Sequence, residues 1–229
     1  MVEPLLFSAT CAGGAAALAR GALSSTSNLF GPVLTRGPNS NALYLTFEDG
    51  PNIWMTPQIL AILRQYRVPA TFFLLGRHVD RFPNLAWGVA DAGHSVANHS
   101  HTHPAPLLAG KRRLSRDLLR SHRTIYHTTG VWPRFIRPPF GHHPPSIHLI
   151  ARRLGCQVAT WQVDAEDHGG RTSEEIRNQV LSHLKPGAII RLRDGHPDDP
   201  FSDHSPMIAA LPQIIAEARQ AGYSFSALA

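Results

Sequence analysis

The alternation of short apolar runs with helix-like stretches is the feature that most constrains the fold of this chain. From residue 42 onward, β-type runs are separated by amphipathic stretches, several of which begin at proline and end at glycine. The runs span 42–47, 70–76, 94–99, 134–137, 157–163, 187–193 and 223–228, and the helical stretches span 57–66, 83–92, 112–128, 144–154, 173–184 and 205–221. Such alternation is typical of parallel β/α units. About seven units in a chain of 229 residues predict a single α/β domain, a barrel rather than an open sheet.

The first 41 residues are predicted to precede this domain, which would span residues 42–229. Residues 5–19 are apolar enough for an export signal or anchor, but no Lys or Arg precedes them. The stretch is also short for a helix that spans a bilayer. A weak export signal or anchor and a loosely docked segment both stay open, as does the location, bacterial cytoplasm or envelope. Membrane contact is expected only through residues 5–19, and residues 23–41 resemble a connector.

The net charge of +6 invites a nucleic-acid function, but the distribution of charge argues against it. Most cations are single arginines scattered along the chain, and the densest group is Lys111-Arg112-Arg113. We therefore expect no nucleic-acid partner. Two cysteines, Cys11 and Cys156, are too few for a disulfide framework or a cysteine metal site. The 14 histidines cluster near acids, which favours metal or acid–base chemistry.

Two short stretches place acids and histidines at the ends of predicted strands. In LTFEDGPN, Glu48 and Asp49 end an apolar run. In HSHTHP, His99 and His103 lie four residues apart, and on one helical turn their imidazoles would share a face. Together with the carboxylate of Asp49 they would form a three-ligand metal site with an open position. A polar surface turn that contains histidines is the alternative.

These two motifs and three later ones resemble, in order and spacing, the signature of the polysaccharide deacetylases, the NodB-homology family also called carbohydrate esterase family 4. The motifs are LTFEDGPN (45–52), HSHTHP (99–104), RPPFG (137–141), WQVDAED (161–167) and the strand GAIIRLRDG (187–195). The resemblance covers residues 42–228. It implies a distorted (β/α)7 barrel and an enzyme that removes N- or O-acetyl groups from chitin-like, peptidoglycan or xylan chains, a hydrolase of C–N bonds other than peptide bonds. It also implies one divalent metal, usually zinc, held by Asp49, His99 and His103.

The resemblance assigns the general base to Glu48, a position where the family has aspartate. A glutamate keeps the chemistry, because the two carboxyl groups have similar ordinary pKa values. Its extra methylene moves the carboxylate by about 1 Å, and a displacement of that size can cost on the order of 10²-fold in rate. Glu48 could equally be a second carboxylate ligand of the metal or an ion-pair partner.

The two middle motifs are expected to complete the site. In RPPFG, the resemblance implies that Arg137 orients the base and that the backbone N–H of Phe140, followed by Gly141, helps to hold an oxyanion. A rigid turn is the alternative for this loop. In the next motif, Trp161 is expected to face the substrate, and the resemblance implies that Asp167 holds the general-acid histidine of the family.

Three further positions depart from the family pattern. His168 stands where the family has a tryptophan that walls the acetyl pocket. Arg191 and Arg193 stand where it has a pocket leucine and the general-acid histidine, and both point to one face of their strand. Arginine cannot donate a proton near neutral pH. A buried guanidinium also needs partners, and Asp167 and Glu48 are the acids expected at neighbouring strand ends.

Two functional hypotheses follow from this pattern. The first is a metal-dependent carbohydrate deacetylase with altered base, acid and pocket, whose acetylated substrate would suit the arginines if it carried negative charge. The second is a non-catalytic barrel that retains the metal and binds a glycan or a partner protein. The intact set of metal ligands favours the first hypothesis, whereas the combined changes favour the second.

Overall fold

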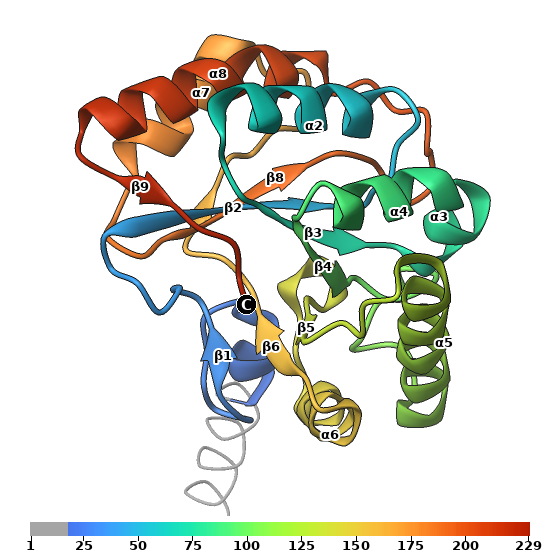
Figure 1. Cartoon of the computed structure of the whole chain (residues 1–229). Helices are drawn as coiled ribbons and strands as arrows, with labels where there is room; N and C mark the ends of the chain where they lie inside the picture. Colours follow the sequence, from blue (N-terminus) through green and yellow to red (C-terminus); the bar gives the residue numbers. More distant parts are fainter. Residues whose placement is uncertain (1–17) are drawn as a thin grey trace, which may run out of the picture.

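The structure, a computed structural model, describes residues 18–229 and contains a sheet of nine strands whose pairs are all parallel. The strands are β1 (Val33–Leu34), β2 (Ala42–Glu48), β3 (Thr71–Leu74), β4 (Ser95–Asn98), β5 (Phe135–Ile136), β6 (Gln157–Ala159), β7 (Val163–Asp164), β8 (Ile189–Arg193) and β9 (Ser224–Phe225). Their order is β1-β6-β5-β4-β3-β2-β8-β7, with β9 beside the start of β2. Within the described residues β1 and β7 do not pair, so the sheet is a half-barrel (Figure 1). The distorted (β/α)7 fold in one domain is confirmed.

Helices cover the outside of the sheet. They are α2 (Met55–Tyr66), α3 (Gly76–Arg81), α4 (Pro83–Asp91), α5 (Lys111–Thr129), α6 (Pro145–Leu154), α7 (Ser173–Ser182) and α8 (Ser205–Gln220), with a short 3-10 turn at Pro139–Gly141. Figure 1 shows α2, α7 and α8 over β2 and β8, whereas α5 and α6 lie beside β4, β5 and β6. The main core joins these layers, and the stacked rings of Phe47 and Phe72 lie 4.9 Å apart in it. Because helices cover it, β2 is buried along its whole length.

The parallel arrangement gathers the carboxyl ends of the strands at one rim. The predicted site residues end a strand or follow one within a few positions, except for Arg191, which lies inside β8. Segments far apart in the sequence thereby contribute side chains to one place, as in other barrels of this kind.

The structure differs from the predicted elements in three places. β1 arises within the predicted connector and pairs with β6, so the sheet begins before residue 42. The run 157–163 is not one strand: β6 pairs with β5, and β7 pairs with β8 on the other side of the sheet. The helix α3 begins inside the predicted strand 70–76, because the N–H groups of Leu75 and Gly76 donate to loop carbonyls rather than continue the ladder.

The predicted export or anchor segment, residues 5–19, lies outside the described residues except for its last two. No helix within residues 18–229 combines the length and the apolar character needed to cross a membrane. The segment that follows packs against the domain. The carbonyls of Ala22 and Ser24 accept hydrogen bonds from the backbone N–H and the Nε2 of His143.

Candidate active site

The three predicted metal ligands meet at the rim formed by the ends of β2 and β4. Asp49 directly follows β2, His99 directly follows β4, and His103 lies four residues further on. The helical turn predicted for the two histidines is wrong. Residues 99–104 form an irregular loop in which Ser100 and His103 adopt positive φ angles of 75° and 55°. This left-handed backbone, rather than a helix face, brings both imidazoles to the carboxylate.

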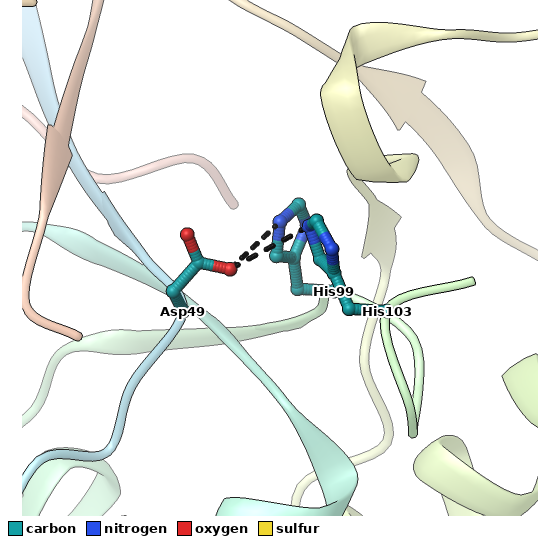
Figure 2. A group of neighbouring side chains, drawn as sticks. All are labelled: Asp49, His99 and His103. Carbon is teal, nitrogen blue, oxygen red and sulfur yellow. Dashed lines mark ion pairs between the residues drawn. The ribbon is translucent and has the colours of Figure 1, made fainter. Parts of the chain in front are cut away.

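The geometry of these ligands suits a divalent metal. Oδ1 of Asp49 lies 3.4 Å from Nε2 of His99 and 3.6 Å from Nε2 of His103 (Figure 2). One ligand atom from each residue lies within 4.8 Å of the others. Asp49 Oδ1 and His99 Nε2 are buried without a hydrogen-bond partner among the described residues, which is unfavourable for polar atoms that nothing else binds. One carboxylate and two imidazoles therefore fit the cofactor that the resemblance implies.

The two imidazoles differ in their hydrogen bonding and in their pKa values. Nδ1 of His99 donates to the carbonyl of Arg137 at 2.8 Å, so that Nε2 faces Asp49. Burial lowers the pKa of His99, but the carboxylates of Asp49 and Glu48 raise it on balance. Burial, together with the charge of His99, lowers the pKa of His103 to about 4. A proton therefore competes with a metal mainly at His99.

The loop that carries both histidines is held by α5, a contact that the sequence pattern did not predict. Asp117 accepts hydrogen bonds from the backbone N–H of His101 at 2.7 Å and from the hydroxyl of Thr102 at 2.6 Å. The imidazole of His101 points away from the ligands, and its Nε2 lies 3.6 Å from Asp80. Asp117 therefore helps to fix this loop, together with the side chains of Asn98 and Ser100, which accept from the N–H groups of Ser100 and His103.

Glu48 ends β2 inside a cluster of arginines. Its Oε2 accepts from Arg137 at 3.1 Å and its Oε1 accepts from Arg191 at 3.3 Å. Parallel register places Arg193 beside it, with Nε 3.9 Å from Oε1. Burial alone would raise the pKa of Glu48, but the surrounding positive groups, led by Arg191, lower it to about 2. The carboxylate is therefore ionised at neutral pH and a weak base.

Arg137 is a fully buried support for this carboxylate. One guanidinium nitrogen donates to the hydroxyl of Thr46 at 2.9 Å and to the carbonyl of Thr160 at 3.0 Å. The guanidinium carbon lies 4.0 Å from the ring centre of Phe73. Burial lowers the pKa of Arg137 to about 10, so it remains a cation at neutral pH.

Arg191, at the position where the resemblance implies a pocket leucine, is itself neutralised. The register of β7 and β8 places it beside Asp164, which accepts hydrogen bonds from its Nε and NH2. Its guanidinium carbon lies 4.0 Å from the ring centre of Trp161. The predicted wall of the pocket is thus a stacked and paired arginine.

Arg193 lies between Glu48, Asp49 and Asp167. NH1 donates to Asp167 Oδ1 at 2.9 Å and to Nδ1 of the exposed His168 at 3.1 Å. Its Nε lies 3.8 Å from Asp49 Oδ2. Although burial lowers it, the pKa of Arg193 is raised on balance by neighbouring carboxylates, with Glu48 first. The predicted pairing of Arg193 with Asp167 is present.

The loop predicted to hold an oxyanion borders His103, one of the predicted metal ligands. Phe140 has a φ angle of 60° and is 55% exposed, and its ring centre lies 4.8 Å from that of His103. Gly141 has a φ angle of 70°, and a Cβ there would lie 2.8 Å from Trp161. A side chain at this position would therefore clash with the predicted substrate-facing tryptophan.

Two further supporting residues, besides Asp117, were absent from the predicted set. Nδ1 of His78 lies 2.9 Å from the backbone carbonyl of Asp49 and holds the turn after β2. Asp194 is buried, and its Oδ2 accepts from the hydroxyl of Thr56 at 2.7 Å. The last motif contains Asp194 and so offered a signal, whereas nothing in the sequence marked His78.

Comparisons with known proteins identify the family. The profile described as polysaccharide deacetylase matches residues 35–159. A chitooligosaccharide deacetylase from Sinorhizobium fredii is 33% identical over 198 residues, which cover 84% of this chain and 92% of the relative. A peptidoglycan-N-acetylglucosamine deacetylase from Bacillus cereus is 33% identical over 193 residues, which cover 84% of this chain and 69% of the relative.

A solved structure agrees with the fold. A mutant of a carbohydrate esterase family 4 pseudoenzyme, with restored enzymatic activity, superposes with a TM-score of 0.78 at 28% identity over 86% of this chain and 70% of that chain. The profile spans more than half of the 229 residues and includes the strands that carry Asp49, His99 and Arg137. The chain belongs to the polysaccharide deacetylase family.

Proposed function

We propose that this chain is a metal-dependent carbohydrate deacetylase that removes O-acetyl groups much faster than N-acetyl groups. The observation that carries the proposal is the ion pair between Arg193 and Asp167, at the position that the resemblance assigns to the proton donor. Relatives named for chitooligosaccharide and peptidoglycan deacetylation support an acetylated carbohydrate as the substrate class.

Asp49, His99 and His103 would hold the metal. We propose zinc, because two imidazoles, one carboxylate and an open position are typical of catalytic zinc sites. When bound, such an ion supplies Lewis-acid activation of water and of the acetyl carbonyl. The backbone N–H of Phe140 is the group that we propose to stabilise the developing oxyanion.

Glu48 would accept the proton of the attacking water. Arg137 holds the carboxylate in place through the 3.1 Å hydrogen bond. A pKa of about 2 makes Glu48 a weaker base than an ordinary glutamate, since proton transfer is most effective when the pKa lies near the working pH. We therefore expect slow turnover even on the preferred substrate.

The leaving group decides which acetyl bond can break. An amine leaves only after its nitrogen has gained a proton, because the amide anion is a far poorer leaving group than an alkoxide. Arg193 cannot supply that proton. An ester releases an alkoxide, which the guanidinium can stabilise by charge and hydrogen bonding until water protonates it. Arginine at position 193 is therefore expected to slow the hydrolysis of amides more than that of esters.

A second candidate function is glycan binding without hydrolysis. It is favoured by the three guanidiniums around Glu48, which hold the base ionised and engaged. The pseudoenzyme with which this structure superposes supports this candidate, because members of the fold exist that lack activity until mutated.

Hydrolysis rates on three substrates test the proposal. Zinc-reconstituted protein is incubated with 4-nitrophenyl acetate, an O-acetylated xylo-oligosaccharide and a chitooligosaccharide, and the Asp49→Asn variant serves as the metal-site control. We expect metal-dependent release of acetate from both esters, and a rate on the chitooligosaccharide lower by at least 10²-fold. Equal rates on ester and amide would contradict the proposal. Absence of hydrolysis on all three, with zinc bound, would favour the second candidate.

A further inference from the structure

One flank of α5 carries a row of four exposed arginines that is continued by an exposed histidine. Arg112, Arg116, Arg120, Arg123 and His127 follow one another at intervals of four, four, three and four residues, and all are exposed. At 3.6 residues per turn these intervals keep the side chains on one face. Successive members lie about 6 Å apart along the axis, and the row is about 22 Å long. We call these five residues the α5 row.

The row borders two adjoining hollows in the protein surface. One hollow is lined by Lys111, Arg112, Arg116 and Arg153, together with a serine. The other contains the remaining members of the row, and Asp80 is its single carboxylate. Asp80 lies 3.6 Å from Arg120, and within residues 18–229 no ion pair reaches the other arginines of the row. The surface therefore carries several positive charges that no carboxylate of the described chain neutralises.

We propose that the α5 row binds a linear anionic polysaccharide that bears carboxylate or sulfate groups. Guanidinium forks suit such oxyanions, and charges about 6 Å apart can be matched by a polymer that carries charge on successive sugars. The row is connected to the candidate active site through Asp80, whose Oδ2 lies 3.6 Å from Arg120 and 3.6 Å from Nε2 of His101. Asp117, on the same helix, accepts hydrogen bonds from the backbone of His101 and Thr102, between the two histidine ligands.

Two other polyanions fit the surface less well. The residues that line the two hollows include no Trp, Tyr or Phe on which nucleic-acid bases could stack, and the exposed Tyr126 beside His127 packs edge-on against Trp132 at one end of the row. Leu119 is the large apolar residue among them and is partly buried, so the lining of the two hollows offers no exposed apolar side chain that could insert into a bilayer. The occupant that the surface fits is therefore a glycan rather than a nucleic acid or a membrane.

Binding of fluorescently labelled oligogalacturonate, measured by polarisation at low salt, tests this inference. The triple variant Arg116→Glu, Arg120→Glu, Arg123→Glu should bind at least 10-fold more weakly than the unaltered protein. The control variant Arg20→Glu, Arg64→Glu, Lys185→Glu changes the net charge equally at exposed cations on other elements and should bind within about twofold of the unaltered protein. Asp80→Asn should bind more tightly. Melting temperatures of all variants establish that they are folded.

The test separates this inference from the proposed function. Binding requires no hydrolysis, and each variant of the α5 row should retain the metal content and any 4-nitrophenyl acetate hydrolysis of the unaltered protein. Equal loss of binding in both triple variants would show a nonspecific effect of net charge and overturn the inference. Tighter binding to a single-stranded oligonucleotide or to phosphatidylglycerol vesicles than to oligogalacturonate would overturn it as well.

Discussion

Arg193 holds Asp167 through both its backbone and its side chain. The N–H of Arg193 donates to Oδ2 of Asp167 at 2.6 Å, and NH1 donates to Oδ1 at 2.9 Å. The carboxylate that the resemblance pairs with a titrating histidine is thus paired with a permanent cation. Such a pair keeps the local structure and removes the proton that an amine leaving group requires.

Replacing this cation with the family residue should restore N-deacetylation. In Arg193→His, the imidazole can hold a proton near neutral pH and can still contact Asp167. We expect the rate on a chitooligosaccharide to rise by about 10²-fold or more, because general acid catalysis contributes roughly 10²–10⁴-fold. The rate should depend on pH with a bell-shaped profile. Measurement of acetate release over pH 5–9 checks this prediction.

Two further variants sharpen the result. Arg193→Gln removes the charge but cannot titrate, so it should leave the chitooligosaccharide rate low. Adding Glu48→Asp to Arg193→His should raise the rate further, and the two effects need not be additive because the residues act in one mechanism. If the double variant binds zinc, folds and still fails to release acetate, the pocket residues Arg191 and His168 are responsible for the defect.

Removal of a metal ligand should abolish stoichiometric metal. His99→Ala or His103→Ala leaves two ligands of a three-ligand site, so we expect zinc content to fall from about one per chain to a small fraction of that after reconstitution and gel filtration. His101→Gln is the matched control, because His101 lies in the same loop but contacts Asp80. Elemental analysis provides the measurement. Equal zinc in the His99 and His101 variants would contradict the assigned site.

Much of the fold and the identity of the site were predictable from short sequence patterns. Parallel strands that alternate with helices must place their carboxyl ends together. Asp49 and His99, which directly follow β2 and β4, could therefore be expected to meet. The pairing of Arg193 with Asp167 was predictable for a related reason, since a buried guanidinium requires a carboxylate and the resemblance supplied one.

The loop geometry could not be predicted in the same way. His103 reaches Asp49 only because its own backbone is left-handed and because Asp117 holds the loop from the middle of α5. Both depend on contacts between residues distant in sequence. Similarly, the pairing of Arg191 with Asp164 follows from the register of β7 and β8, and the sequence predicted one strand where β6 and β7 are separate.

The buried Asp194 should make the stability of the metal-free protein depend on pH. Burial, with a further contribution from the charge of Asp49, raises the pKa of Asp194 to about 7, although the hydrogen bond from Thr56 lowers it. Between about pH 4 and pH 7 the folded state then binds more protons than the unfolded state, so this residue's contribution to stability falls as pH rises. This contribution to stability is fully present below about pH 4 and is lost above about pH 7.

Asp194→Asn isolates this effect. The amide oxygen can still accept from Thr56, but the side chain no longer titrates. We expect the melting temperature of the chelator-treated variant to fall less between pH 4 and pH 8 than that of the unaltered protein. If the melting temperatures of the two proteins changed equally with pH across this range, Asp194 would not hold the proton in the folded state.

The charge balance of the site predicts that an anion binds only together with the metal. Four carboxylates face three guanidiniums in the cluster, which leaves one net negative charge on these groups. The residues are Glu48, Asp49, Asp164, Asp167, Arg137, Arg191 and Arg193. A divalent cation would reverse the sign of this net charge. The arginines alone therefore do not suffice to attract an acidic ligand, since each is already paired.

Thermal shifts with and without zinc test this linkage. A ligand that binds only the folded state raises the melting temperature, and at a given concentration the rise is larger for a tighter ligand. We expect acetate at about 20 mM, a concentration chosen to occupy a weak site, to raise the melting temperature of the zinc-loaded protein. The same concentration should leave the melting temperature of the chelator-treated protein nearly unchanged. The neutral control, N-acetylglucosamine at equal concentration, should shift the zinc-loaded protein less. A similar shift by acetate in both forms would mean that the guanidiniums bind anions without the metal and that the ion pairs around Glu48 are weaker than their distances indicate.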